Sequence, residues 1–190
     1  MSAFHVEKMS PDTWCDFEIL FDKHKGVRGG CWCMFHRLSS TVFNSLSKDE
    51  RKAAHYDQVM AGRSAGLILY EGIEPIGWCH YGPASYFEQY DRGRTYKKWD
   101  IPPDLQPDWR VACFFVDKDH RKRGLVRLLL GHVLETIQAD GGGIVEAFPL
   151  VVAGSNKPQY AGKVALFEDF GFDQVTMLGT TQMLMRKRID

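Results

Sequence analysis

The segment from Val111 to Val126 constrains the fold of this 190-residue chain more than any other feature. It begins with six consecutive apolar residues, Val111–Val116, a run that is typical of a strand buried on both faces. A charged turn that contains Gly124 follows, and an apolar stripe at helical spacing begins at Val126. A buried strand that leads through a glycine turn directly into a helix is typical of α/β sheets.

The patterns before and after this segment predict further helices and strands. Ser10-Pro11-Asp12 is typical of a helix start, and Ser47 with Glu50 forms a capping box for another helix. The expected elements, in chain order, are a strand at 4–9, helices at 11–25 and 47–61, a hairpin at 67–81, an irregular surface excursion at 85–108, a strand at 111–116, a helix at 126–137, a strand at 144–148, a helix at 164–170 and a closing hairpin at 173–186. This order predicts one mixed α/β sheet and no domain break.

Composition excludes several classes of protein. Lysine plus arginine and aspartate plus glutamate both number 24, so the formal net charge is zero, which argues against a nucleic-acid binder. No apolar run approaches the roughly 20 residues of a membrane span, and the N-terminus has no secretory signal pattern. The five cysteines are an odd and sparse set, which favours free thiols and a cytoplasmic protein without a membrane partner.

The turn between the buried strand and the helix predicts an anion site. A helix N-terminus presents unpaired amides, and Gly124 permits close approach to the backbone. Local positive charge is added by Arg121, Lys122, Arg123 and Arg127. The alternative is a solvated basic turn. Neither a Walker loop nor a dinucleotide fingerprint is present, because the required glycines and the Lys-Ser/Thr pair are missing.

The sequence contains two motifs, one after the other along the chain, that resemble those of the GNAT superfamily of acyl-CoA-dependent N-acyltransferases. Arg121-x-x-Gly124-x-Val126, after a Phe-x-Val strand, is similar to its motif A, and Val164–Phe172 is similar to its motif B. The resemblance implies a single domain over residues 1–190, with an N-terminal strand and helices in 1–65 and the central hairpin, cofactor-binding unit and closing elements in 66–190. It implies an α/β (α+β) fold with a single mixed, mostly antiparallel sheet flanked by helices.

The resemblance also implies where acetyl-CoA binds. Backbone groups of Phe114 and Val116 would lie alongside the pantetheine arm, and an amide near Val116 would polarise the thioester carbonyl. Amides from Arg121 to Val126 would hold the pyrophosphate. The expected cofactor-binding residues are Phe114, Phe115, Val116, Arg121, Lys122, Arg123, Gly124, Leu125, Val126, Arg127, Asn156 and Phe167.

Three departures from the family pattern concern proton transfer and cofactor contact. Val126 replaces a residue that is usually small, although its amide is retained. Phe167 stands where many relatives carry the tyrosine that protonates the departing thiolate, so Tyr160 or a water would have to take that role. Tyr160 in turn stands where relatives often have an asparagine that contacts CoA, and Asn156 is a candidate to replace that contact.

Two residues are candidates for the general base. Glu146 lies in an apolar strand, where burial would raise its pKa, so it is either a base or a salt-bridge partner, unless it faces solvent. His80, on the second strand of the central hairpin, is a base or a core histidine. Asp117 and Asp119 are expected to face solvent at the turn.

Cys31-x-Cys33 and the nearby His36 leave three interpretations open. A zinc site normally needs four ligands, and the remaining cysteines and histidines show no completing pair, so no metal is expected. The segment could instead form a thiol-rich wall of the acceptor pocket, since a similar run recurs in a subgroup of the resembled family. Core packing is the third interpretation.

The sequence therefore predicts an N-acetyltransferase that moves an acetyl group from acetyl-CoA to a primary amine, by direct attack in a ternary complex. A small-molecule acceptor is expected, because no feature indicates a protein-docking groove. Dimers are frequent in the family, so a homodimer is a further expectation. The alternatives are a non-catalytic acyl-CoA-binding or regulatory module of the same fold and a cysteine-based redox or metal protein.

Overall fold

A seven-stranded sheet forms the centre of the computed structural model, which describes residues 4–151 and 160–190. The strand order is β1-β2-β3-β4-β5-β7-β6, and among these strands only β4 and β5 pair in parallel. The strands are β1 (Phe4–Lys8), β2 (Leu67–Glu71), β3 (Glu74–Pro83), β4 (Trp109–Val116), β5 (Gly143–Ala147), β6 (Asp173–Leu178) and β7 (Gln182–Ile189). The prediction of a single mixed, mostly antiparallel sheet flanked by helices is confirmed.

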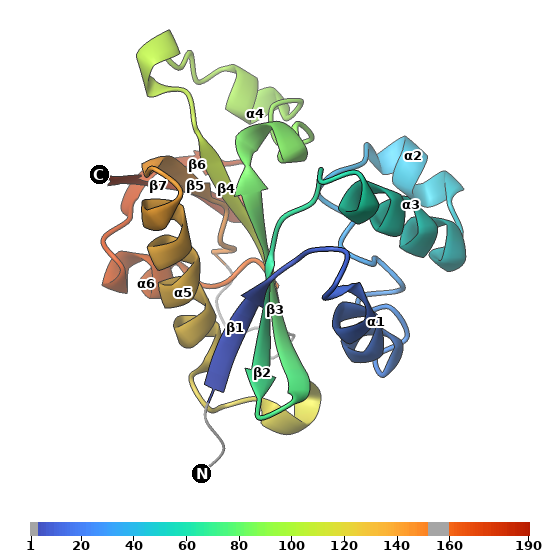
Figure 1. Ribbon diagram of the computed structural model, residues 1–190. Helices are drawn as coiled ribbons and strands as arrows, with labels where there is room; N and C mark the ends of the chain where they lie inside the picture. The colour runs from blue at the N-terminus through green and yellow to red at the C-terminus, as the bar shows by residue number, and fades with distance from the viewer. Residues whose placement is uncertain (1–3, 152–159) are drawn as a thin grey trace.

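Helices cover both faces of this sheet (Figure 1). One face carries α5 (Leu125–Ala139) and α6 (Val164–Asp169), and the other carries α1 (Trp14–Asp22), α2 (Ser40–Ser45) and α3 (Lys48–Met60). The apolar stripe of α5 forms the first half of the core, with buried Leu125, Leu129, Leu130, Val133 and Ile137. The second half of the core is aromatic, with Phe17 and Phe21 of α1 packed on Trp78 of β3.

A β-bulge in β4 changes the direction of this strand. Cys113 pairs with His80, whereas Val111 pairs with Tyr81, so Ala112 has no partner on β3. An unpaired extra residue bends the strand that carries it and strengthens its local twist. As a result, the second half of β4 turns away from the line of its first half.

Beyond the bulge, β4 and β5 separate. Their ladder runs only from the Trp109–Val145 pair to the Val111–Ala147 pair, and β5 ends there while β4 continues to Val116. In the opening, the backbone N–H of Phe114 donates to the carbonyl of Tyr160 at 2.6 Å. The separation leaves the second half of β4 without a strand partner on the β5 side, directly before the turn that leads to α5.

The first helix differs from its prediction at both ends. α1 begins at Trp14 rather than at Pro11, because Ser10 and Thr13 bond to each other in a preceding turn, with the Ser10 amide donating to Thr13 Oγ1 at 2.9 Å. It ends at Asp22 rather than at Lys25, because Lys25 has a φ of 55° that a helix does not accommodate. By contrast, the capping box at the start of α3 is confirmed.

The excursion between β3 and β4 is more ordered and more buried than predicted. It contains η1 (Ala84–Phe87), α4 (Arg94–Lys97) and η2 (Pro103–Leu105). The side chains of Phe87 and Tyr96 are buried, and Tyr90 stacks on Phe148 with ring centres 3.7 Å apart. The expectation of a surface excursion is therefore wrong for these aromatic residues, which cover one face of β4 and β5.

Among the helices of the described residues, none is both long and apolar enough to cross a membrane.

Candidate functional site

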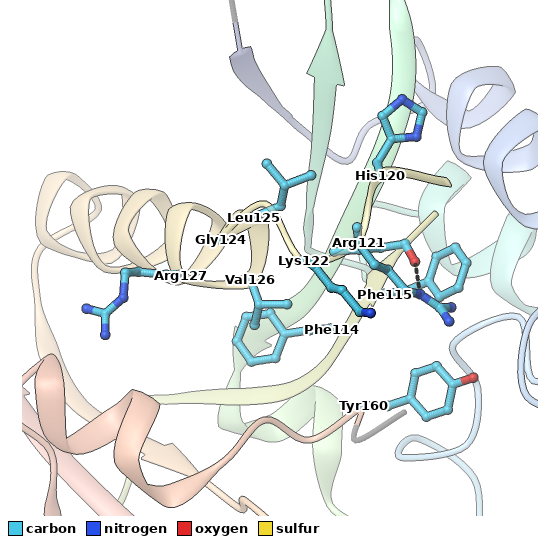
Figure 2. Close-up of a pocket in the computed structure, with 11 residues that line it drawn as sticks. Phe114, Phe115, His120, Arg121, Lys122, Gly124, Leu125, Val126, Arg127 and Tyr160 are labelled. Carbon is cyan, nitrogen blue, oxygen red and sulfur yellow. Dashed lines mark hydrogen bonds between the residues drawn. The ribbon is translucent and has the colours of Figure 1, made fainter. Parts of the chain in front are cut away.

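A cavity of about 340 Å³ lies between the second half of β4 and the start of α5, and we call it the β4–α5 groove. Its volume is in the range of small-molecule sites. Figure 2 shows the residues that line it, which are Phe114, Phe115, Val116, His120, Arg121, Lys122, Gly124, Leu125, Val126, Arg127 and Tyr160. All of them except His120 were predicted from the sequence, as cofactor-binding residues or, for Tyr160, as a catalytic one.

The backbone at the start of α5 is shaped for an anion. Lys122 and Gly124 both have positive φ, 64° and 75°, and Gly124 caps the helix in the left-handed conformation. Such turns aim successive amides in one direction, and the helix N-terminus adds partial positive charge. A Cβ added at Gly124 would meet nothing within 4 Å, so the space in front of these amides is open. The residues present therefore fit a phosphate-bearing ligand.

The basic side chains of the turn divide into two groups. Arg121 lines the groove and donates from Nε to the Val116 carbonyl at 3.1 Å, the bond drawn in Figure 2. Arg127 also lines it and pairs with Asp169 of α6. Arg123 instead forms a two-fold ion pair with Glu71, at 2.7 and 2.8 Å, and lies outside the groove lining.

The exposed edge of β4 has polar partners within the protein. Phe114 gives its amide to Tyr160, and Val116 receives Arg121 at its carbonyl. Backbone groups two residues apart on a strand point to the same side, so both face the opening between β4 and β5. An extended ligand that pairs with this edge has to replace the Tyr160 carbonyl.

A second, narrow cavity adjoins the groove, and we call it the thiol cavity. It shares Phe115 and Tyr160 with the groove, and its volume of about 10 Å³ has room for one water molecule. The remaining lining residues are Phe21, Val27, Arg28, Cys31, Cys33, Phe35, His36 and Cys113. Part of the Cys31–His36 segment therefore lines a cavity, and part of it packs in the core, so the acceptor-pocket interpretation stays a prediction.

Tyr160 is the catalytic candidate that lies in the lining of both cavities. Burial raises the pKa of its phenol, and the nearby Arg121 and Arg28 oppose this shift without reversing it. The phenol therefore keeps its proton at neutral pH. His36 of the thiol cavity is held in its neutral form, because burial and then the charge of Arg28 lower its pKa to about 3.

Glu146 lies in a row of charged side chains across three strands. It pairs in register with Arg110 on β4 and Arg186 on β7. Its carboxylate accepts from Arg110 Nε at 3.1 Å and from Arg186 Nη2 at 2.6 Å, and the Tyr96 hydroxyl donates to it at 2.9 Å. The side chain is fully buried and lines neither cavity. Of the alternatives raised by the sequence, the salt bridge is the one observed.

His80 is also enclosed. The residue has no exposed surface and packs against Trp78, His55 and Phe87. Among the described residues, neither of its ring nitrogens has a hydrogen-bond partner. Burial lowers its pKa well below the usual value, with Arg37 adding to the effect, so the imidazole is neutral. It lines neither cavity.

Asp117 corrects a prediction. It was expected to face solvent, but its side chain is fully buried and lies 2.5 Å from Lys23 Nζ. Burial by itself would raise its pKa, but the Lys23 ammonium, the Asp119 amide and His24 outweigh burial and lower the pKa to about 2. The carboxylate ties the turn after β4 to the end of α1. Asp119 is 61% exposed, as expected.

Like Arg123, the predicted cofactor residue Phe167 remains outside the groove lining. Phe167 is fully buried behind Phe114, with ring centres 6.2 Å apart, and does not reach the groove. Asn156 lies outside the described residues. Conversely, sequence reasoning missed Arg28, an isolated basic residue in a loop that gives no signal, and His120, which directly precedes the predicted basic turn.

Within 4–151 and 160–190, no three side chains of histidine, cysteine, aspartate or glutamate are grouped so as to hold an ion.

Comparisons with known proteins agree with this geometry. No curated protein matches the sequence. Solved structures with the same fold include a GNAT-family acetyltransferase from Streptococcus pneumoniae, at 13% identity and a TM-score of 0.55, covering 99% of this chain and 100% of that one. The ribosomal-protein-S18-alanine N-acetyltransferase of Escherichia coli has 13% identity and a TM-score of 0.53, covering 98% and 94%.

A third structure was determined with a ligand. The PaiA N-acetyltransferase of Thermoplasma acidophilum, in complex with coenzyme A, has 11% identity and a TM-score of 0.53, covering 98% of this chain and 99% of that one. At the sequence level, the model of the acetyltransferase (GNAT) family matches residues 32–172, which is most of the chain and includes the groove. The protein therefore belongs to the GNAT family of acetyltransferases.

Proposed function

We propose that the protein transfers the acetyl group of acetyl-CoA to a primary amine of a small molecule, by direct attack within a ternary complex. The observation that carries this proposal is the β4–α5 groove, in which an anion-binding helix N-terminus continues into an exposed strand edge. A ligand with a pyrophosphate at one end and an amide-containing arm matches both parts.

The residues of the groove have distinct tasks in this proposal. The amides between Arg121 and Val126 bind the pyrophosphate, with Arg121 and Lys122 adding positive charge. The edge of β4 at Phe114 and Val116 holds the arm after the Tyr160 carbonyl is displaced. Acetyl-CoA is a co-substrate that supplies the acetyl thioester, and this edge orients the thioester towards the acceptor side.

Tyr160 is the proposed general acid. It lies in the walls of both cavities, and its raised pKa keeps a proton available for the departing thiolate. It would thereby fill the place that Phe167 leaves vacant.

Among the described residues, no aspartate or glutamate lines either cavity, and residues 152–159 contain none. The ammonium proton is therefore passed to water before the neutral amine attacks. Glu146 acts instead as a positioning residue, because its ion pairs join β4, β5 and β7 next to the point where β4 and β5 separate.

A second candidate function is a non-catalytic acyl-CoA-binding module. It is supported by Phe167 in place of the family's tyrosine and by the enclosure of Glu146 and His80 away from both cavities. In that case the groove binds acetyl-CoA and no acetyl group is transferred.

Acetyl-CoA turnover with a panel of amines tests the proposal. The panel contains alkyl amines, aryl amines and peptides with free N-termini, and the readouts are CoA release and the mass of the acetylated product. We expect turnover with at least one small amine. Tight CoA binding without turnover of any amine would support the module, and turnover of peptides alone would overturn the small-molecule acceptor.

A further inference from the structure

Three free thiols form a connected cluster at the thiol cavity. Cys31, Cys33 and Cys113 are all buried and all line this cavity. Cys33 lies two residues from Cys31 in the chain and lines the cavity together with Cys31 and Cys113. The Trp78 indole also donates to Cys33 Sγ, at 2.8 Å. The proposed acetyl transfer uses none of these sulfur atoms.

The sulfur of Cys31 lies in a site that stabilises negative charge. Arg28 lines the same cavity and supplies a nearby positive charge, and the Cys31 amide donates to the Val27 carbonyl at 3.0 Å. The neighbouring Cys33 and the charge of Arg28 lower the pKa of Cys31, although burial opposes them. The pKa of Cys33 is raised instead, chiefly by burial. The pair therefore consists of one thiol biased towards thiolate and one that holds its proton.

The backbone around the pair is held in an unusual conformation. Trp32 and Cys33 have positive φ values of 46° and 56°, and Lys25, Val27 and Arg28 precede them with positive φ as well. Non-glycine residues rarely adopt this region, and clusters of them are typical of functional sites. Here the unusual conformation lies between Lys25 and Cys33, and Cys31 and Cys33 both line the thiol cavity.

The size of the cavity selects what can reach these thiols. With room for about one water molecule, the cavity admits one end of a molecule as small as hydrogen peroxide, whereas larger thiol reagents do not fit. Arg28 and Phe35 are exposed members of its lining, so the cavity reaches the surface. By contrast, Cys15 on α1 is exposed and stands apart from the cluster.

We propose that Cys31 and Cys33 form a peroxide-sensitive site, in which Cys31 is oxidised first and Cys33 closes a disulfide with it. The Cys31 thiolate attacks one oxygen of hydrogen peroxide, the O–O bond breaks and hydroxide leaves, which gives a sulfenic acid. The Cys33 sulfur then attacks the Cys31 sulfur, the S–O bond breaks and water leaves. The two thiols lose two electrons to the peroxide, and a dithiol reductant returns them.

Peptide mapping of the full-length protein tests this site. Trypsin yields one peptide with the proposed pair and separate peptides with the cysteines used for comparison. Cys31 and Cys33 lie in Gly29–Arg37, Cys113 lies in Val111–Lys118 and Cys15 lies in Met9–Lys23. After hydrogen peroxide treatment, denaturation and alkylation, we expect Gly29–Arg37 to be two hydrogens lighter and not alkylated. The other two peptides should be fully alkylated, and dithiothreitol should restore both labels on Gly29–Arg37.

Variants assign the order of events. In Cys33→Ser, the Cys31 sulfenic acid should accumulate and react with dimedone when the protein is denatured in the presence of this reagent, and Cys31→Ser should abolish the disulfide. Cys15→Ser is the matched control and should behave like the wild type. Near-UV circular dichroism confirms that each variant is folded, and a variant that fails is replaced by its alanine counterpart.

Three results would overturn the proposal. The first is oxidation of Cys15 at the same rate as the pair, the second is a disulfide between Gly29–Arg37 and Val111–Lys118, and the third is full alkylation of all five cysteines after peroxide. The test measures thiol chemistry alone, so its outcome is independent of whether the protein transfers acetyl groups.

Discussion

The two sides of the opening between β4 and β5 are built in different ways. The groove side comes largely from one contiguous segment, Phe114–Arg127, with Tyr160 as its long-range addition. On the other side, the thiol cavity combines the Cys31–His36 segment with Cys113, and the ion-pair row of Arg110, Glu146 and Arg186 joins three strands. A site made by one strand, turn and helix can be predicted from local sequence, whereas a site made by strand register cannot.

The largest expected effect concerns the ion-pair row. Glu146→Gln leaves Arg110 and Arg186 without their shared carboxylate, and loss of one partner from a buried pair costs about 3–5 kcal/mol. Urea unfolding measures this loss in the free energy of unfolding. The pH profile of turnover should keep its shape, because Glu146 is a positioning residue in our proposal.

The control for that variant is Glu135→Gln on the outer side of α5, where the side chain is 74% exposed. It should change the free energy of unfolding by less than about 0.5 kcal/mol. A Glu146→Gln protein as stable as this control, or one with a displaced pH profile, would contradict the positioning role.

The next largest effect is a loss of stability in acid, which is expected because the protein buries neutral histidines. Burial lowers the pKa of His55 from 6.5 to about 3, so the unfolded chain binds a proton that the folded protein rejects. The stability that His55 contributes is fully present above pH 6.5 and is lost as the pH falls towards 3, by about 1.4 kcal/mol per pH unit.

Urea unfolding at pH 7 and pH 5 measures this dependence. His55→Gln should reduce the difference between the two pH values, whereas His5→Gln on the exposed strand β1 should leave it unchanged. Equal pH dependence in both variants would show that His55 does not contribute to it.

A smaller effect is expected where the turn after β4 is tied to α1. Asp117→Asn removes the ion pair with Lys23 and should cost about 1–3 kcal/mol at pH 7. Because the folded pKa is lowered from 3.8 to about 2, this contribution is present above pH 3.8 and disappears as the pH falls through 2. Thermal unfolding measures it, with Asp119→Asn as the control. Equal stability of the two variants would refute the buried tie.

The smallest expected effect is a difference in CoA affinity between variants of two arginines in the same turn. Arg121 lines the groove, so Arg121→Ala should weaken CoA binding by about ten-fold, or about 1.4 kcal/mol. Arg123 is paired with Glu71 outside the groove lining, so Arg123→Ala should change CoA binding by less than about two-fold. Equal losses of affinity for the two variants in a CoA titration would contradict the placement of Arg121 in the groove and Arg123 outside it.

The features that the sequence predicted correctly come from local patterns, whereas those that it missed depend on contacts between residues far apart in the chain. The buried run of β4, Gly124 and the α5 stripe are local patterns, and the structure has each of them where it was predicted. The row of Arg110, Glu146 and Arg186 depends on pairing between β4, β5 and β7, which no local pattern specifies. For the same reason, a salt bridge was one of the alternatives that the sequence left open for Glu146, and its partners could not be named.

The loop after α1 shows a second limit. Its glycines indicated only that the helix ends, whereas the structure has non-glycine residues such as Trp32 and Cys33 at positive φ. Such conformations are imposed by tertiary packing, here against the aromatic core at Phe21 and Trp78. Residue type alone gives no indication of them. The solvent exposure expected for Asp117 failed similarly, because its partner Lys23 is remote in sequence.

The most direct test of the account compares two glycines that have the same backbone conformation. Gly124 in the groove and Gly179 in the turn between β6 and β7 have φ values of 75° and 74°, and a Cβ on either meets nothing within 4 Å. Valine at either position should cost about 1–2 kcal/mol of stability. In a calorimetric titration with CoA, Gly124→Val should bind about ten-fold more weakly or worse, and Gly179→Val should bind like the wild type. Equal affinities of the two variants would contradict the assignment of the groove as the pyrophosphate site.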